Sequence, residues 1–128
     1  MYEKEMSKKV LDVGNCGPDN FTLTDLVSNQ FGAEVVRAHG MQDALEQLRN
    51  GSFDLVTVNR KMDRDGSSGL EIIKAIKADE ALASNNVMMV TNFDDHQKLA
   101  VDAGAEPGYG KKNINSAETL ALFEKYLG

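Results

Sequence analysis

The residue that ends one strand-like run limits the chemistry available to this chain. Residues 53–58 form that run, and Asn59 follows it directly. A carboxylate at the end of such a strand could accept a phosphoryl group, because it offers an anionic oxygen as the nucleophile. The amide of Asn59 has no such oxygen. We therefore expect no covalent phosphorylation at this residue.

Five strands and five helices are predicted from the periodicity of apolar residues. The strands are expected at residues 9–13, 34–38, 55–58, 87–90 and 108–111. Each is followed by an apolar stripe with helical spacing, and Gly32 is expected to end the first helix. The expected N-caps are Asp19 or Asn20 for the first helix, Asp94 for the fourth and Asn115 for the fifth, the last with Glu118 in a capping-box arrangement.

The regular alternation of strands and helices predicts an α/β fold with a parallel sheet covered on both faces. We favour a doubly wound, flavodoxin-like (βα)5 arrangement with strand order 2-1-3-4-5. Its ligand crevice would lie beyond the carboxyl ends of the first and third strands. One domain is expected over residues 8–128, preceded by a short tail over residues 1–7.

Composition narrows the range of partners and compartments. The chain has 128 residues and a net charge of −6, which argues against nucleic acid or an anionic membrane as the main partner. No apolar run approaches the roughly 20 residues of a membrane span, and residues 1–6 do not resemble a secretory signal. The single cysteine, Cys16, permits no intramolecular disulfide. We therefore expect a cytoplasmic protein.

Several short segments resemble one known family in their order and spacing. They are residues 87–91, 103–105 and 108–109 with Lys112, residues 53–56 with Met62 and residues 69–71, and residues 77–82. Together they resemble the receiver domains of bacterial response regulators, and residues 77–82 resemble the single-domain chemotaxis type. The resemblance covers residues 8–127 and implies a signalling protein of a two-component phosphorelay system.

The family uses five positions for its chemistry. Two acidic residues after the first strand hold Mg²⁺, and an Asp after the third strand accepts the phosphoryl group. A Ser or Thr after the fourth strand and a Lys after the fifth then hold the phosphoryl oxygens. The resemblance places Asn59 at the acceptor position and Thr91 and Lys112 at the last two, with Lys111 as the alternative to Lys112.

The acidic pair has no clear counterpart. It falls on Gly14 and Asn15, or on Asn15 and Cys16 if Pro18 sets the alignment, and a third alignment would use Asp12. In the first two alignments the site lacks every carboxylate of the family pattern. Mg²⁺ usually needs at least one carboxylate in such a site. We therefore expect no bound Mg²⁺ and no other cofactor.

Three further residues carry alternatives. Lys61 could place its own ammonium in the vacant cation position, or it is a solvated surface lysine. Lys112 is expected to reach solvent, a carbonyl oxygen or Asp12, because an unpaired buried ammonium is costly. Tyr109 matches the family's switch aromatic, but without a phosphoryl group we expect an ordinary half-buried ring beside the last helix.

These observations leave three hypotheses about function. The first is an atypical pseudo-receiver, not an enzyme, that signals by contacting proteins without being phosphorylated. By resemblance, its partners would bind the face built from the fourth helix, fifth strand and fifth helix, within residues 94–127. The second is a working phosphorelay receiver with a displaced acceptor, such as Asp12, Asp63 or Asp65. The third is a flavodoxin-like binder of a small cofactor.

Overall fold

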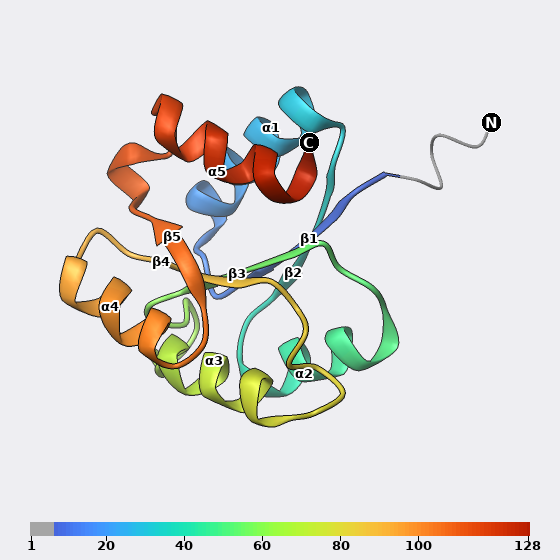
Figure 1. Cartoon of the computed structure of the whole chain (residues 1–128), viewed down its shortest axis with the longest axis vertical. Helices are drawn as coiled ribbons and strands as arrows, with labels where there is room; N and C mark the ends of the chain where they lie inside the picture. Colours follow the sequence, from blue (N-terminus) through green and yellow to red (C-terminus); the bar gives the residue numbers. More distant parts are fainter. Residues whose placement is uncertain (1–6) are drawn as a thin grey trace.

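A computed structural model of the chain describes residues 7–128, and it contains five parallel strands in one sheet (Figure 1). Along the sheet the strand order is β2-β1-β3-β4-β5. This is the predicted doubly wound, flavodoxin-like arrangement, and the prediction is confirmed. The strands are β1 (Lys9–Val13), β2 (Glu34–Ala38), β3 (Leu55–Asn59), β4 (Val87–Val90) and β5 (Glu106–Tyr109).

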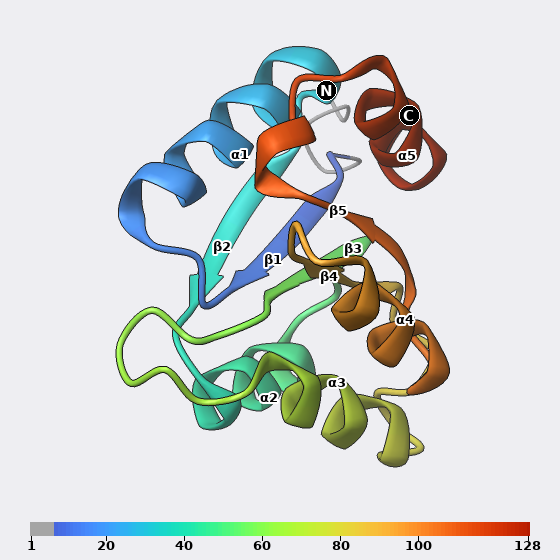
Figure 2. The ribbon, with the colours of Figure 1, turned by 90° about the vertical axis from the view of Figure 1, so that its left-hand side faces the viewer.

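Helices cover both faces of this sheet. Figure 2 shows α1 and α5 on one side and α2, α3 and α4 on the other. A strand buried on both faces needs apolar side chains on both, which explains the nearly continuous apolar runs in the sequence. The helices are α1 (Gly17–Phe31), α2 (Met41–Asn50), α3 (Gly69–Ala78), α4 (Asp94–Asp102), α5 (Ala117–Leu127) and the short 3-10 helix η2 (Lys111–Asn113).

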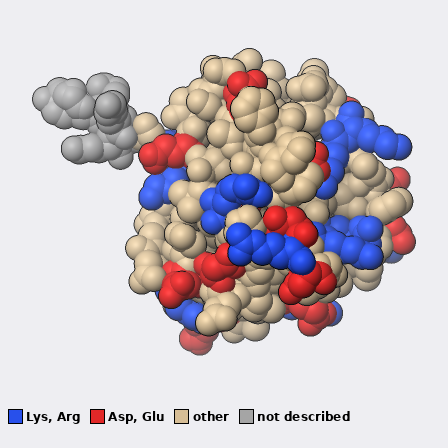
Figure 3. Space-filling view, turned by 180° about the vertical axis from the view of Figure 1, so that it is seen from behind, with Lys and Arg blue, Asp and Glu red and all other residues tan. Residues whose placement is uncertain are grey.

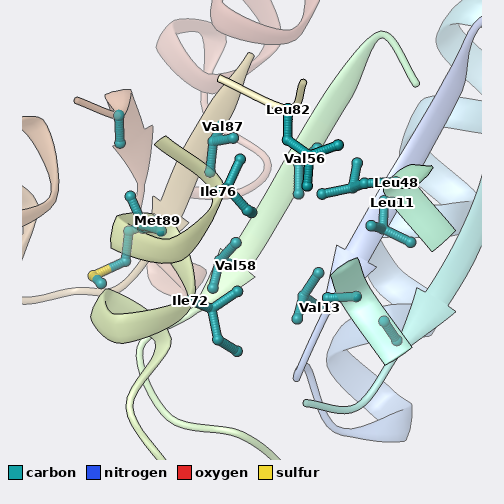
Figure 4. Packing of buried hydrophobic residues seen from close by; sticks show 14 of the residues in the cluster. Leu11, Val13, Leu48, Val56, Val58, Ile72, Ile76, Leu82, Val87 and Met89 are labelled. Carbon is teal, nitrogen blue, oxygen red and sulfur yellow. The ribbon is translucent and has the colours of Figure 1, made fainter. Parts of the chain in front are cut away.

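The core divides into two layers, one on each side of the sheet. Alternate residues of a strand point to opposite faces, so neighbours such as Val10 and Leu11 belong to different layers. In the layer under α2, α3 and α4, Leu11, Val56 and Ile76 pack together (Figure 4). Val10 lies in the other layer, under α1 and α5. This packing fixes the strand ends that carry the site.

The first helix starts earlier than its sequence suggests. Neither Asp19 nor Asn20 caps α1, which begins at Gly17 with Cys16 as its N-cap. Pro18 explains the difference, because proline is favoured in a first helical turn where its missing N–H is not needed. At the other end, the prediction that Gly32 ends the helix is confirmed, since Gly32 is a left-handed C-cap with φ of 65°.

The last two helices also differ at their starts. The residue before α4 is Phe93, so the expected cap Asp94 is already helical. Ser116 caps α5 in place of Asn115, and its hydroxyl accepts a hydrogen bond from the Thr119 N–H at 3.1 Å. A serine one residue along makes the same bond that was expected of the asparagine.

The fifth strand lies two residues before its predicted position, over Glu106–Tyr109. Its pairing with β4 shifts register between Met88 and Val90. The side chain of Gln97 fills the gap in the ladder. Its amide donates to the Met89 carbonyl at 2.9 Å, and its oxygen accepts from the Gly108 N–H at 3.0 Å.

The surface carries charges of both signs. In Figure 3, Lys and Arg side chains alternate with Asp and Glu over the face seen from behind. Within residues 7–128 no helix has both the length and the apolar character needed to cross a bilayer. Among the described residues, the large apolar side chains that remain exposed are Phe21, Met41, Phe93, Leu99 and Val101.

Candidate functional site

A pocket of about 200 Å³ opens at the carboxyl ends of β3 and β4. Four of its lining residues were predicted site residues, namely Asn59, Lys61, Thr91 and Lys111. They meet there because the carboxyl ends of parallel strands lie along one edge of the sheet. The other lining residues are Arg60, Val90, Asn92 and Phe93.

Asn59 holds the start of the loop that follows β3. Its side-chain amide donates a hydrogen bond to the Lys61 carbonyl at 2.6 Å. The loop returns close to the strand, because the Gly69 N–H donates to the Arg60 carbonyl at 2.8 Å. A side chain at Gly69 would collide with the carbonyl of Asn59. The amide at position 59 therefore has a structural role for which a carboxylate lacks the donor.

Thr91 directly follows β4 and is hydrogen-bonded to Tyr109 at the end of β5. The Thr91 N–H donates to the Tyr109 carbonyl at 3.0 Å, and the Thr91 hydroxyl accepts from the Phe93 N–H at 3.2 Å. The ring of Tyr109 packs edge-on against Phe123 of α5, with centroids 5.2 Å apart. Its position beside the last helix is confirmed, but the ring is buried rather than half-buried.

Burial has an electrostatic consequence for Tyr109. It raises the pKa of the phenol well above its ordinary value, and the nearby carboxylates of Asp12 and Asp19 raise it further. The phenol therefore stays neutral at physiological pH.

Of the two candidate lysines, the structure brings Lys111 to the pocket. The Lys111 ammonium lies 2.6 Å from a carboxylate oxygen of Asp19. Lys112 is exposed, and its backbone N–H donates to the Asn92 side chain at 3.0 Å. The peptide bond between Lys112 and Asn113 is trans, as expected when the second residue is not proline.

The positions expected for the acidic pair do not contribute to this pocket. Gly14 adopts a left-handed φ of 81°, and a side chain there would collide with Met62. Asn15 is buried and turned toward Asp12, to which its amide donates at 2.6 Å. Cys16 is exposed, with its thiol 3.2 Å from Asp19. The loop after β1 therefore supplies no carboxylate to the Asn59 pocket.

Asp12 lies in the β1 strand itself and is 1% exposed. Its carboxylate accepts hydrogen bonds from Asn15, from Asn20 at 2.8 Å and from the Thr57 hydroxyl at 2.8 Å. Burial raises its pKa, and these hydrogen bonds partly oppose the shift. Asp12 therefore anchors β1 to β3 and to the first turns of α1.

Thr57 and Asn20 were not predicted from the sequence as partners of Asp12. A signal was present for Thr57, because Asp12 and Thr57 are the polar residues in the interiors of two strands whose other interior residues are apolar. They are also direct neighbours in the β1–β3 register. No comparable pattern marks Asn20.

Cations dominate the Asn59 pocket. Arg60, Lys61 and Lys111 line it, and its lining within the described part of the chain contains no carboxylate. The guanidinium of Arg60 lies 5.1 Å from the ring centroid of Phe93, and Lys61 is exposed. Whether the Lys61 ammonium replaces a metal charge remains a hypothesis.

These residues do not fit the Mg²⁺ that the family resemblance implies. Mg²⁺ takes hard oxygen ligands, usually with at least one carboxylate. Across residues 7–128, no three His, Cys, Asp or Glu side chains are grouped so as to hold a metal ion. The pocket instead presents ammonium and guanidinium groups, which repel a divalent cation.

Comparisons with known proteins agree with this architecture. A family model described as "response regulator receiver domain" matches residues 18–123. The chain is 24% identical to the receiver domain of a DNA-binding response regulator from Colwellia psychrerythraea, with a TM-score of 0.79 and coverage of 93% of this chain and 97% of the other.

Two further solved structures are similar. The chain is 23% identical to the chemotaxis protein CheY4 of Vibrio cholerae, with a TM-score of 0.69 and coverage of 94% of this chain and 99% of the other. It is 21% identical to a LuxR-family two-component response regulator from Aurantimonas, with a TM-score of 0.77 and coverage of 94% of this chain and 85% of the other.

Proposed function

Because the chain belongs to the family of response regulator receiver domains, we propose that it serves two-component signalling as a pseudo-receiver that acts without being phosphorylated. Its output in this proposal is a contact with another protein. Neither Mg²⁺ nor another cofactor takes part, and we place the protein in the cytoplasm.

One observation carries the proposal, namely the amide of Asn59 in a pocket lined by three cations. Phosphoryl transfer to a receiver needs an anionic oxygen, and charge that develops on the phosphoryl group is normally offset by a metal. Asn59 cannot supply the oxygen, and its amide is already bonded to the Lys61 carbonyl. The described residues that line the pocket include no carboxylate that would hold the metal.

A displaced acceptor is less well supported by the geometry. Asp12 is buried, with both carboxylate oxygens hydrogen-bonded. The carboxylate of Asp63 lies 3.1 Å from the His39 ring nitrogen and 3.8 Å from Arg37. Asp65 accepts a hydrogen bond from the Ser67 N–H within the exposed loop. Not one of the three acids lines the Asn59 pocket in the described chain.

Incubation with acetyl phosphate and Mg²⁺, followed by intact-mass analysis, tests the proposal. We expect the mass to stay unchanged, while a phosphorylatable receiver treated in parallel gains one phosphoryl group. A stoichiometric adduct that survives acid and is lost in base would identify an acyl phosphate. Peptide mapping would then show whether Asp12, Asp63 or Asp65 carries it, and the pseudo-receiver proposal would be abandoned.

The partner-binding face is proposed by analogy with the family. A groove of about 310 Å³ lies between α4, β5 and α5. Gln97, Tyr109 and Leu122 line its inner part, and Asp94 and Glu118 contribute carboxylates. A partner seated in this groove should protect the backbone amides of β5 and the start of α5 from hydrogen exchange.

A further inference from the structure

A second hollow lies next to the Asn59 pocket, between the loop over residues 60–68 and the helices α3 and α4. Its volume is about 170 Å³, and its apolar side chains are Leu70, Met89 and Leu99. Pockets for drug-sized ligands span roughly 300–1,000 Å³, so this hollow suits a single side chain. The remaining lining residues are Arg60, Lys61, Gly66, Ser68 and His96.

The two hollows form one surface, because Arg60 and Lys61 line both. Two large apolar side chains on this surface remain open to solvent. Phe93 is 53% exposed and Leu99 is 47% exposed. Exposed apolar groups that gather beside a hollow with a polar rim are typical of protein interaction sites.

The charge of this surface is opposite to that of the whole chain. The net charge is −6, yet no described carboxylate lines either hollow. Asp63, in the same loop, is directed to Arg37 and His39. Arg60 and Lys61 therefore form no ion pair within residues 7–128, and a partner rich in carboxylates gains attraction here that a basic one lacks.

We propose that this surface binds an acidic protein segment that places one apolar side chain in the hollow beside Leu99 and a carboxylate near Arg60 and Lys61. The proposal rests on the proposed function in one respect, namely that no metal or phosphoryl group occupies the Asn59 pocket. The surface adjoins the α4-β5-α5 groove, because Thr91 and Asn92 line both the Asn59 pocket and the groove, but the hollow beside Leu99 shares no lining residue with the groove. His96 and Leu99 of α4 line the hollow, whereas Asp94 and Gln97 line the groove.

Selection from a random peptide display library on the whole, unphosphorylated chain tests the specificity. We expect enrichment of acidic sequences that contain one Phe, Leu, Ile or Met. Nitrogen-15 NMR shifts on titration of a selected peptide should then be largest around Arg60, Lys61 and Leu99. The proposal is overturned by neutral or basic enriched sequences, by shifts centred on the α4-β5-α5 groove, or by the absence of any binder.

Point variants separate this surface from its surroundings. Arg60→Gln and Lys61→Gln should each weaken binding of a selected peptide about two- to fivefold, as for exposed ion pairs. Leu99→Gln should weaken it about tenfold, as for an interface anchor. Val101→Gln is the matched control, because Val101 is 42% exposed on the same helix but lines neither hollow.

Equal losses for Val101→Gln and Leu99→Gln would contradict the proposal. So would affinity that does not fall as ionic strength rises, because exposed charge attraction is screened by salt. All four positions are half-buried or exposed, so the variants should retain the fold, which circular dichroism would verify.

Failure of this inference can be told apart from failure of the proposed function. A phosphorylated chain that still binds acidic peptides at Leu99 would reject the pseudo-receiver and leave the surface standing. A chain that resists phosphorylation but binds its peptides in the α4-β5-α5 groove would reject the surface alone.

Discussion

The Lys111 ammonium lies 2.6 Å from the carboxylate of Asp19, so the cation that follows β5 is paired with the first turn of α1. The family resemblance gives one lysine after β5 the role of holding a phosphoryl group, and Lys111 is the alternative to Lys112 for that role. In this chain the Asp19 carboxylate neutralises the Lys111 ammonium. This pair links α1 to η2 and gives Lys111 an anionic partner within the chain.

We expect the Asp19–Lys111 pair to contribute less than about 1 kcal/mol to the free energy of unfolding, because both side chains are about one third exposed. A double-mutant cycle with Asp19→Asn and Lys111→Met, followed by urea unfolding, measures this coupling. The hydrogen bond from Lys111 lowers the pKa of Asp19 below its ordinary 3.8. The coupling should therefore be complete at pH 7 and disappear as the pH falls below about 4.

A coupling above about 2 kcal/mol, or one that persists in acid, would show that the pair is less solvated than the structure indicates. Raising the salt concentration provides a second check, because an exposed pair should weaken.

The sequence predicted the sheet well because its strands are buried on both faces and therefore form apolar runs. The strand over residues 87–90 is predicted to the residue. The helix starts were predicted less well, since several polar residues near each start can serve as caps. The fifth strand was misplaced because Gln97, which lies in α4 outside both strands, completes its ladder with β4. Such a contact leaves no periodic signal.

For the site, the sequence predicted which residues line the pocket, but it did not predict the backbone conformation that places them. Asn59 and Thr91 line the pocket as their places after β3 and β4 suggested. The choice between Lys111 and Lys112 depends on a turn of 3-10 helix, which the pattern of residues did not reveal. The left-handed φ of Gly14 was equally hidden. In the first alignment Gly14 occupies the first acidic position, where any residue with a side chain would be strained.

Gly14→Ala should therefore lower the free energy of unfolding by about 1–3 kcal/mol. The left-handed backbone conformation is unfavourable for a residue with a Cβ. In addition, the new Cβ would press against the Met62 side chain. Gly17→Ala is the matched control, because nothing lies within 4 Å of a Cβ built there. Chemical denaturation of both variants measures the difference, and equal stabilities would show that the loop after β1 relaxes freely.

Asp12 should give the fold an unusual pH dependence. Burial raises its pKa in the folded state above 3.8, so the folded state binds the proton more tightly than the unfolded state does. The ionised group therefore costs stability above the folded pKa, and this cost is relieved as the pH falls toward 3.8. The Asp12→Asn variant has no carboxylate at this position, so this pH-dependent cost is absent. The free energy of unfolding of the wild type should rise relative to this variant between pH 7 and about pH 4.

Urea unfolding of both proteins across that range provides the measurement. Hydrogen bonds lost in the variant change the difference in free energy of unfolding between the two proteins by the same amount at every pH. The slope of that difference against pH therefore reports the titration of Asp12. A difference that is constant, or that shrinks toward acid, would mean that the hydrogen bonds from Asn15, Asn20 and Thr57 outweigh burial.

Asn59→Asp alone should not create a phosphorylatable receiver. The new carboxylate would supply the nucleophilic oxygen, but the loop after β1 would still offer no carboxylate to hold Mg²⁺ beside it. Intact-mass analysis after treatment with acetyl phosphate and Mg²⁺ should show no adduct, in contrast to a phosphorylatable receiver run in parallel.

The same substitution should also loosen the loop over residues 60–68. The Asn59 amide donates a hydrogen bond to the Lys61 carbonyl oxygen. A carboxylate at position 59 would place a second hydrogen-bond acceptor next to that oxygen, and the hydrogen bond would be lost. We expect a loss of about 1 kcal/mol in the free energy of unfolding and faster hydrogen exchange in this loop. Rapid phosphorylation of Asn59→Asp would contradict the argument, because it would require metal ligands from acids such as Asp63 or Asp65 after a rearrangement of that loop.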